Sequence, residues 1–100
     1  MKVKARYFAT IREIVGKREE VFEVPEDTTV HDFLDMLSEK YGKAFRDYVF
    51  DEGREELSPN LNFLVDGKNV VMMNGIKTTM YDGCVFAIIP PVGGGMGARR

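Results

Sequence analysis

The residues of this chain best suited to chemistry are three consecutive glycines near its end, Gly93-Gly94-Gly95. They follow an apolar segment and a Pro-Pro-Val sequence at residues 90–92. The prolines fix φ and favour an extended backbone, and glycine has no Cβ, so such a segment can thread a narrow enzyme channel. A terminal glycine carboxylate held there is open to activation by a nucleotide and to attack by a sulfur or amine nucleophile. This composition indicates a working backbone carboxyl, not a side chain in a pocket.

The same glycines have two other interpretations, and the residues that follow them set a condition on the proposed carboxyl chemistry. A phosphate-binding loop needs a following helix and a Lys-Ser/Thr pair, and neither is recognisable after Gly95. A flexible, inert tail over residues 93–100 is the ordinary alternative. With Met96–Arg100 attached, Gly95 ends in an amide, which cannot be activated in this way. A protease removes these residues, or the chain lacks this carboxyl chemistry, or they belong to a genomic fusion; the sequence leaves all three open.

Length and composition predict one soluble domain over residues 1–92, followed by the glycine-rich tail. A chain of 100 residues with 44% hydrophobic residues can bury a core. The net charge of −2 argues against a nucleic-acid module, which needs a clustered positive field. The charged N-terminal segment is not a signal peptide, and no apolar run approaches membrane-spanning length. We therefore expect a cytoplasmic protein without nucleic-acid or membrane partners.

The polar residues form no autonomous catalytic or metal-binding pattern. His31 has no nucleophile beside it in sequence and is interpreted as a surface histidine. Cys84 begins an apolar segment and is expected in the core. The acidic run over residues 51–56 lacks the spacing of a calcium loop and is interpreted as a solvated loop. Residues 70–73, Val-Val-Met-Met, are either core or an exposed apolar patch that meets a partner.

The elements that position the tail begin with two strands. Alternation of period two predicts a strand over residues 2–8, and residues 21–24 predict a second strand that pairs with it as a wide hairpin. Between them, Thr10 and Glu13 have capping-box spacing, which predicts a one-turn helix that Gly16 stops.

One strong helix and a short one follow. Thr29 is a suitable N-cap and Gly42 a suitable stop for the long helix. Its apolar residues recur at helical spacing and predict packing across a sheet: Val30, Phe33, Leu34, Leu37 and Tyr41. Residues 43–50 are interpreted as a short helix or turn against the core.

The last strands complete the predicted sheet. Residues 61–65 form a strand, and Asp66-Gly67 is a hairpin turn signal into a short strand at residues 69–71. Asp82-Gly83 introduces residues 84–89, whose continuous apolar character predicts a central strand buried on both faces. We expect it to lie beside the first strand and parallel to it.

Three segments together resemble a known family, the MoaD/ThiS family of ubiquitin-like sulfur carrier proteins. Residues 3–16 are similar to the family's first strand and turn, residues 65–69 to its hairpin, and residues 82–95 to its Pro-Pro-Val-x-Gly-Gly ending. The resemblance is strongest to MoaD, the molybdopterin synthase small subunit, and to archaeal MoaD-like modifiers. It covers nearly the whole chain. It implies an α+β, β-grasp fold: a mixed sheet of four to five strands with one main helix packed across it.

The resemblance also implies site residues. Gly94 and Gly95 match the family's terminal pair, so the Gly95 carboxyl would be adenylated by an E1-like enzyme that uses ATP, and then converted to a thiocarboxylate. No cofactor would be bound stably by the chain itself. The positions at which the family meets its partners correspond here to Phe8, Val70, Ile89, Pro90, Pro91, Val92 and Gly93.

Three functions are compatible with this resemblance, and in none is the chain an enzyme by itself. The form of the ending favours a sulfur carrier, the small subunit of molybdopterin synthase, which acts with a MoaE-like large subunit after removal of residues 96–100. The alternative is a ubiquitin-like modifier that forms isopeptide bonds to target-protein lysines. The third is an inactive β-grasp interaction module.

Overall fold

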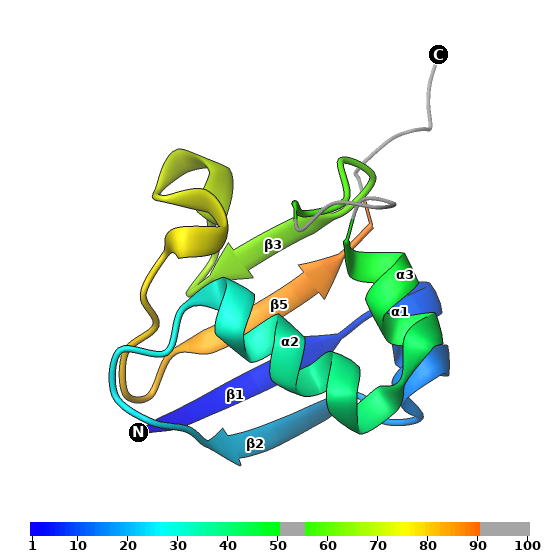
Figure 1. The fold of residues 1–100 in the computed structure, drawn as a ribbon, viewed down its shortest axis with the longest axis horizontal. Helices are drawn as coiled ribbons and strands as arrows, with labels where there is room; N and C mark the ends of the chain where they lie inside the picture. Colours follow the sequence, from blue (N-terminus) through cyan, green and yellow to red (C-terminus); the bar gives the residue numbers. More distant parts are fainter. Residues whose placement is uncertain (51–55, 91–100) are drawn as a thin grey trace.

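The computed structural model describes residues 1–50 and 56–90. Five strands form one mixed sheet in the order β2-β1-β5-β3-β4, and the long helix α2 crosses one face of it (Figure 1). The strands are β1 (Lys2–Tyr7), β2 (Glu19–Glu23), β3 (Asn62–Val65), β4 (Lys68–Asn69) and β5 (Val85–Ile89). The α-helices are α1 (Ala9–Val15), α2 (Val30–Tyr41) and α3 (Lys43–Val49), and the 3₁₀ turns are η1 (Val70–Met72) and η2 (Gly75–Lys77).

The sheet confirms the predicted place of the last strand. β5 lies between β1 and β3, parallel to β1 and antiparallel to β3. In the parallel pair, Lys4 is opposite Val85 and Tyr7 is opposite Ile88. The two strands therefore end side by side, and the chain leaves β5 at the same edge at which it leaves β1.

Helix α2 forms as its sequence predicts. The Thr29 hydroxyl accepts a hydrogen bond from the Asp32 amide at 3.1 Å, and the Asp32 carboxylate accepts one from the Thr29 amide at 3.2 Å. This capping box satisfies amide groups that a helix start leaves without partners. Gly42, with φ 93°, ends the helix. Four members of the predicted apolar stripe are buried: Val30, Phe33, Leu34 and Leu37.

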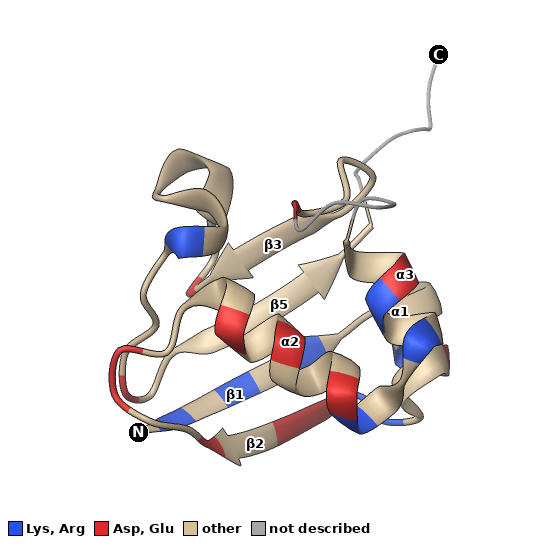
Figure 2. Cartoon of the chain, viewed as in Figure 1, with Lys and Arg blue, Asp and Glu red and all other residues tan. Residues whose placement is uncertain are grey.

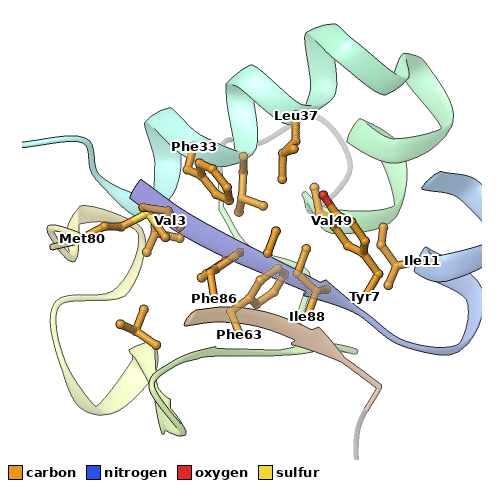
Figure 3. Packing of buried hydrophobic residues seen from close by; sticks show 14 of the residues in the cluster. Val3, Tyr7, Ile11, Phe33, Leu37, Val49, Phe63, Met80, Phe86 and Ile88 are labelled. Carbon is orange, nitrogen blue, oxygen red and sulfur yellow. The ribbon is translucent and has the colours of Figure 1, made fainter. Parts of the chain in front are cut away.

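The core lies between this helix layer and the sheet (Figure 3). Phe33 and Leu37 point from α2 toward Phe86 and Ile88 of β5, and all four side chains are fully buried. The rings of Phe33 and Phe86 meet edge to face, with their centroids 5.7 Å apart. Burial of such apolar surface is the main favourable term in folding, so β5 is held in place by the packing of its helix-facing side chains.

A polar cluster joins the end of α2 to strand β2. The Glu20 carboxylate accepts hydrogen bonds from the hydroxyls of Tyr41 and Tyr7 and from the Lys40 ammonium. Burial alone would raise the pKa of Glu20, but the hydrogen bonds from Lys40 and Tyr41, with the nearby charges of Lys40 and Lys17, lower it below its ordinary value. Burial and the carboxylate raise the pKa values of both tyrosines. Glu20 is therefore ionised in the fold and hydrogen-bonded by neutral phenols.

The predicted capping box at the first helix is wrong. Helix α1 begins at Ala9, its N-cap is Phe8 without a side-chain hydrogen bond, and Thr10 lies inside the helix. The extended backbone of β1 continues to Phe8 and turns directly into the helix, and burial of Ile11 and Val15 fixes the orientation of α1. The predicted stop is confirmed, since Gly16 ends α1 with φ 86°.

Two predictions about the later strands need correction. β5 is not buried on both faces: Phe86 and Ile88 are fully buried, whereas the alternate residues Val85, Ala87 and Ile89 are only half-buried. The helices pack on one face of the sheet, so the opposite side chains of β5 keep contact with solvent.

The second correction concerns the predicted strand at residues 69–71. After the Asp66-Gly67 turn, in which both residues have positive φ as a type I′ turn requires, β4 spans only two residues. The Asn69 side chain then accepts a hydrogen bond from the Val71 amide at 3.0 Å, which turns the chain into η1.

Candidate functional site

The candidate site is the edge of the sheet at which β5 ends, toward the glycine run. Phe8 and Ile89 follow the last parallel pair, Tyr7 and Ile88, so they leave the two strands side by side. Tyr7 and Ile88 are buried under the helices, and in extended backbone successive side chains alternate in direction. Phe8 and Ile89 therefore point to the other face, and both are half-buried, while Pro90 is exposed. We call Phe8, Ile89 and Pro90 the tail root.

The face of the sheet opposite the helices continues this surface. We call it the open face and define it by the half-buried residues Leu64, Val85, Ala87 and Ile89. Leu64 is opposite Ala87 across the β3–β5 pair, so these side chains form one apolar strip over the two central strands. Such a partly exposed apolar strip, which ends at the point where the chain leaves the sheet, is suited to contact with a partner protein.

Lys and Arg residues lie along β1, the strand beside β5 (Figure 2). Lys4 and Arg6 lie opposite Val85 and Ala87 in the parallel register. Both form ion pairs with the Glu19 carboxylate of β2, at 3.6 Å for Lys4 and 3.8 Å for Arg6. On the other side, the Asn69 amide donates to the Asn62 side chain at 3.1 Å. The surface is thus apolar in its centre and polar at both margins.

Two arginines meet the ring of Phe8. The guanidinium carbon of Arg6 lies 5.6 Å from the ring centroid, and that of Arg12 lies 6.0 Å from it. Arg12 also donates a hydrogen bond from Nε to the Tyr7 carbonyl at 3.3 Å. The sequence points to Phe8 but to neither arginine, because only the packing of α1 against the end of β1 brings both arginines to one ring.

One predicted partner-binding residue does not lie at the surface. The side chain of Val70 is fully buried in the core, so it does not present apolar surface to a partner. The neighbouring side chains are the exposed ones: Val71 is 77% exposed and Met72 82%. Of the two interpretations of residues 70–73, core applies to Val70, and an exposed patch applies to the residues after it.

The remaining predicted site residues lie outside the part of the chain that the structure describes. These are the partner-binding positions Pro91, Val92 and Gly93 and the activated pair Gly94 and Gly95. The predicted boundary between domain and tail, at residues 92 and 93, also lies there, as does most of the predicted loop at 51–56. Their roles remain predictions.

Hydrogen bonds to Asp66 stabilise the start of β5. Its carboxylate accepts hydrogen bonds from the Val85 amide, at 2.8 Å, and from the Tyr81 hydroxyl. These two bonds hold the pKa of Asp66 below its usual range, and the carboxylate raises the pKa of Tyr81 to about 12. This network fixes the end of β5 that is far from the tail root, and no chemistry is required of it.

The other candidate groups form no second site. Within residues 1–50 and 56–90, no group of three metal-ligating side chains gathers, and no helix is both long and apolar enough to cross a bilayer. Cys84 is buried as predicted, and burial raises the pKa of its thiol. His31 is half-buried, with its ring centroid 5.7 Å from that of Phe50.

The fold and the place of the glycine run define the class of protein. A mixed sheet crossed by one helix, with a central last strand that precedes the glycines in the sequence, is the β-grasp, ubiquitin-like arrangement. The family description "ThiS family" matches residues 5–95. The chain therefore belongs to the ThiS family, a family of sulfur carriers and ubiquitin-like modifiers.

Individual relatives agree with this assignment. The chain is 38% identical over 96 residues to small archaeal modifier protein 3 of Haloferax volcanii, which covers 95% of this chain and all of that protein. The solved structure of small archaeal modifier protein 1 from Methanosarcina acetivorans has a TM-score of 0.79 and 32% identity, over 94% of this chain and 96% of the other. A Pyrococcus furiosus protein described as a candidate molybdopterin converting factor, subunit 1, has a TM-score of 0.73 and 33% identity, over 92% and 99%.

Proposed function

We propose that this chain is a ubiquitin-like modifier whose Gly95 carboxyl, exposed by removal of residues 96–100, is activated with ATP and joined to lysines of target proteins. The observation that carries the proposal is that the family match ends at Gly95. A second observation is that β5, the last strand before the glycines in the sequence, lies at the centre of the sheet. The similarity to archaeal modifier proteins supports this alternative better than the molybdopterin synthase role that the sequence favoured.

The proposed chemistry balances in three steps. Water hydrolyses the peptide bond between Gly95 and Met96, which leaves a carboxylate on Gly95 and an amine on Met96. The carboxylate then attacks the α-phosphate of ATP, giving an acyl adenylate and pyrophosphate. Finally a lysine amine attacks the acyl carbon, forms the isopeptide bond and displaces AMP with loss of a proton. Gly94 and Gly95 have no Cβ, so no side chain hinders attack at this carbon.

Sulfur transfer is the second candidate, and the similarity to the Pyrococcus protein favours it. The acyl adenylate is common to both functions. In sulfur transfer a persulfide sulfur displaces AMP, and reduction of the resulting acyl disulfide by a thiol leaves a thiocarboxylate on Gly95. Its acceptor would be a pterin precursor held by a molybdopterin synthase large subunit. The two functions differ in the nucleophile, not in the carrier.

In both cases the chain acts with other proteins. An ATP-dependent, E1-like enzyme would bind it through the tail root and the open face, because these surfaces adjoin the strand that leads to Gly95. The chain itself would hold no ATP and no stable cofactor. An inactive interaction module remains the outcome if Gly95 is never exposed.

The test is the intact mass of the protein from its own cells, together with its covalent conjugates under reducing, denaturing conditions. We expect a species that ends at Gly95 and isopeptide-linked conjugates that a Gly95 deletion abolishes. A species heavier by one oxygen-to-sulfur exchange, without conjugates, would assign sulfur transfer instead. A chain that always ends at Arg100 would contradict both functions.

A further inference from the structure

We propose that Arg6 and Arg12, gathered at the ring of Phe8, form a basic docking element for an acidic surface of the enzyme that activates the tail. This inference rests on the proposed function and adds the chemistry of the partner to it. The element lies at the tail root, where the chain leaves the sheet toward Gly95.

The two arginines converge from different elements. Arg6 belongs to β1 and Arg12 to α1, yet both guanidinium carbons lie within 6.0 Å of the centroid of the Phe8 ring. A cation over an aromatic face is attracted by the ring's quadrupole, and Arg12 is held further by its hydrogen bond to the Tyr7 carbonyl at 3.3 Å. The ring thus holds two like charges close together on the surface.

These charges are poorly neutralised within the described part of the chain. Arg6 pairs with Glu19 at 3.8 Å, but the same carboxylate also serves Lys4 at 3.6 Å, and the Arg6 and Glu19 side chains are half exposed, at 52% and 50%. Exposed pairs of this kind contribute little. No carboxylate of the described residues forms an ion pair with Arg12. The planar guanidinium group of Arg12 can donate two parallel hydrogen bonds to a carboxylate.

Chain length favours a protein carboxylate over the nucleotide as the acidic group. Residues 90–95 separate the sheet from the carboxyl that reacts, and six residues span up to about 20 Å when extended. At an ionic strength of 0.1 M, charges further apart than about 10 Å are largely screened. Phosphates at the end of an extended tail therefore lie too far away to attract the arginines. The surface that meets the open face, immediately beside Ile89, is within reach.

The experiment measures pyrophosphate exchange by the activating enzyme purified from the same cells, with the carrier recovered as the form that ends at Gly95. We expect Arg12→Ala to raise KM for the carrier about tenfold, and Arg6→Ala with Arg12→Ala about a hundredfold, with kcat unchanged. Added salt should raise the wild-type KM but have little effect on that of the double variant. Arg12→Lys keeps the charge but loses the paired hydrogen-bond donors of the guanidinium. Its KM should lie between those of the wild type and of Arg12→Ala.

A matched control removes two other cations. Lys68 and Lys77 are exposed, and Lys68 is opposite Val65, which pairs with Phe86 at the far end of β5 from the tail root. Lys68→Ala with Lys77→Ala should leave KM and its salt dependence unchanged, and thermal unfolding of all variants confirms that they fold.

The outcomes separate this inference from the proposed function. If the wild-type chain supports exchange and the arginine variants have the same KM and salt dependence, the docking element is wrong and the function stands. If the arginine variants bind ATP less well than the wild-type chain in the absence of enzyme, the acidic group is the nucleotide and the inference is also wrong. If the wild-type chain supports no exchange, the proposed function itself fails.

Discussion

The two faces of the sheet differ in burial and therefore in role. On the helix-covered face, Phe86 and Ile88 of β5 are fully buried beneath α2. On the open face, Ala87 and Ile89 of the same strand are half-buried. Because side chains of a strand alternate, one short strand supplies both the centre of the core and the surface beside the tail.

This difference separates stability from function. The covered face consists of apolar side chains in close contact, so a change there alters the free energy of unfolding. The open face and tail root combine an apolar strip with the charges of Lys4, Arg6 and Arg12, so a change there should alter recognition. The parallel pairing of β1 and β5 joins the two, since it brings Phe8 and Ile89 to one edge.

The largest expected effect on stability is in the core. Leu37 is fully buried, and Leu37→Ala should lower the free energy of unfolding by about 2–5 kcal/mol, because it removes apolar contacts and leaves a cavity. Urea unfolding at neutral pH measures it. Val71→Ala, at a side chain that is 77% exposed, is the control and should change this free energy by less than about 0.5 kcal/mol. Equal losses of unfolding free energy in the two variants would contradict the conclusion that stability depends on the covered face.

A smaller effect is expected at the start of α2. Thr29→Ala removes the hydroxyl that accepts the Asp32 amide at 3.1 Å, and loss of such a cap costs about 1 kcal/mol. Thr29→Ser keeps the oxygen and should restore most of the stability. If serine were no better than alanine in urea unfolding, packing of the Thr29 methyl group, not capping, would account for the loss.

Sequence predicted these stability-determining features best. The Thr29 cap, the apolar stripe of α2 and the central place of β5 depend on local spacing and on continuous apolar character, and both are visible in one dimension. The Thr10 capping box had the same kind of signal and was wrong, because the turn out of β1 starts the helix earlier. Local propensity gives way where tertiary packing fixes the boundary.

The candidate site was less predictable. Phe8 and Ile89 were identified through the resemblance, but Val70 was assigned to a partner surface although it is buried. A shift of one residue in a turn exchanges a buried side chain for an exposed one, and a strand pattern does not resolve it. The convergence of Arg6 and Arg12 on Phe8 joins two elements, so spacing along the chain gives no sign of it.

Glu20, on the helix-covered side of the sheet, contributes to stability through its charge, and this contribution should depend on pH. Because the folded pKa of Glu20 is lowered from its ordinary 4.5, its contribution to stability is present above pH 4.5 and is lost as the pH falls through the folded value. Glu20→Gln should lower the free energy of unfolding at pH 7 by about 0.5–1 kcal/mol. Near pH 3 the difference from the wild type should shrink.

Urea unfolding at the two pH values measures this difference. Glu39→Gln, at an exposed position of α2, is the matched control and should behave as the wild type at both. A Glu20→Gln penalty that stayed constant with pH would mean that the shape of the side chain, not its charge, matters.

The smallest effect on stability is expected in the tail, where the effect on function should be large. Gly94→Ala should change the free energy of unfolding by less than about 0.5 kcal/mol, because the packed faces of the sheet lie within residues 1–90. It should still impair activation, since a Cβ would obstruct a channel shaped for bare backbone.

The measurements are urea unfolding and pyrophosphate exchange on the same preparation. Gly97→Ala is the control, because it lies in the segment that removal of residues 96–100 would discard, and it should leave exchange unchanged. If Gly94→Ala unfolded the domain as Leu37→Ala is expected to, the tail would belong to the packed structure and the division between the two regions would be wrong.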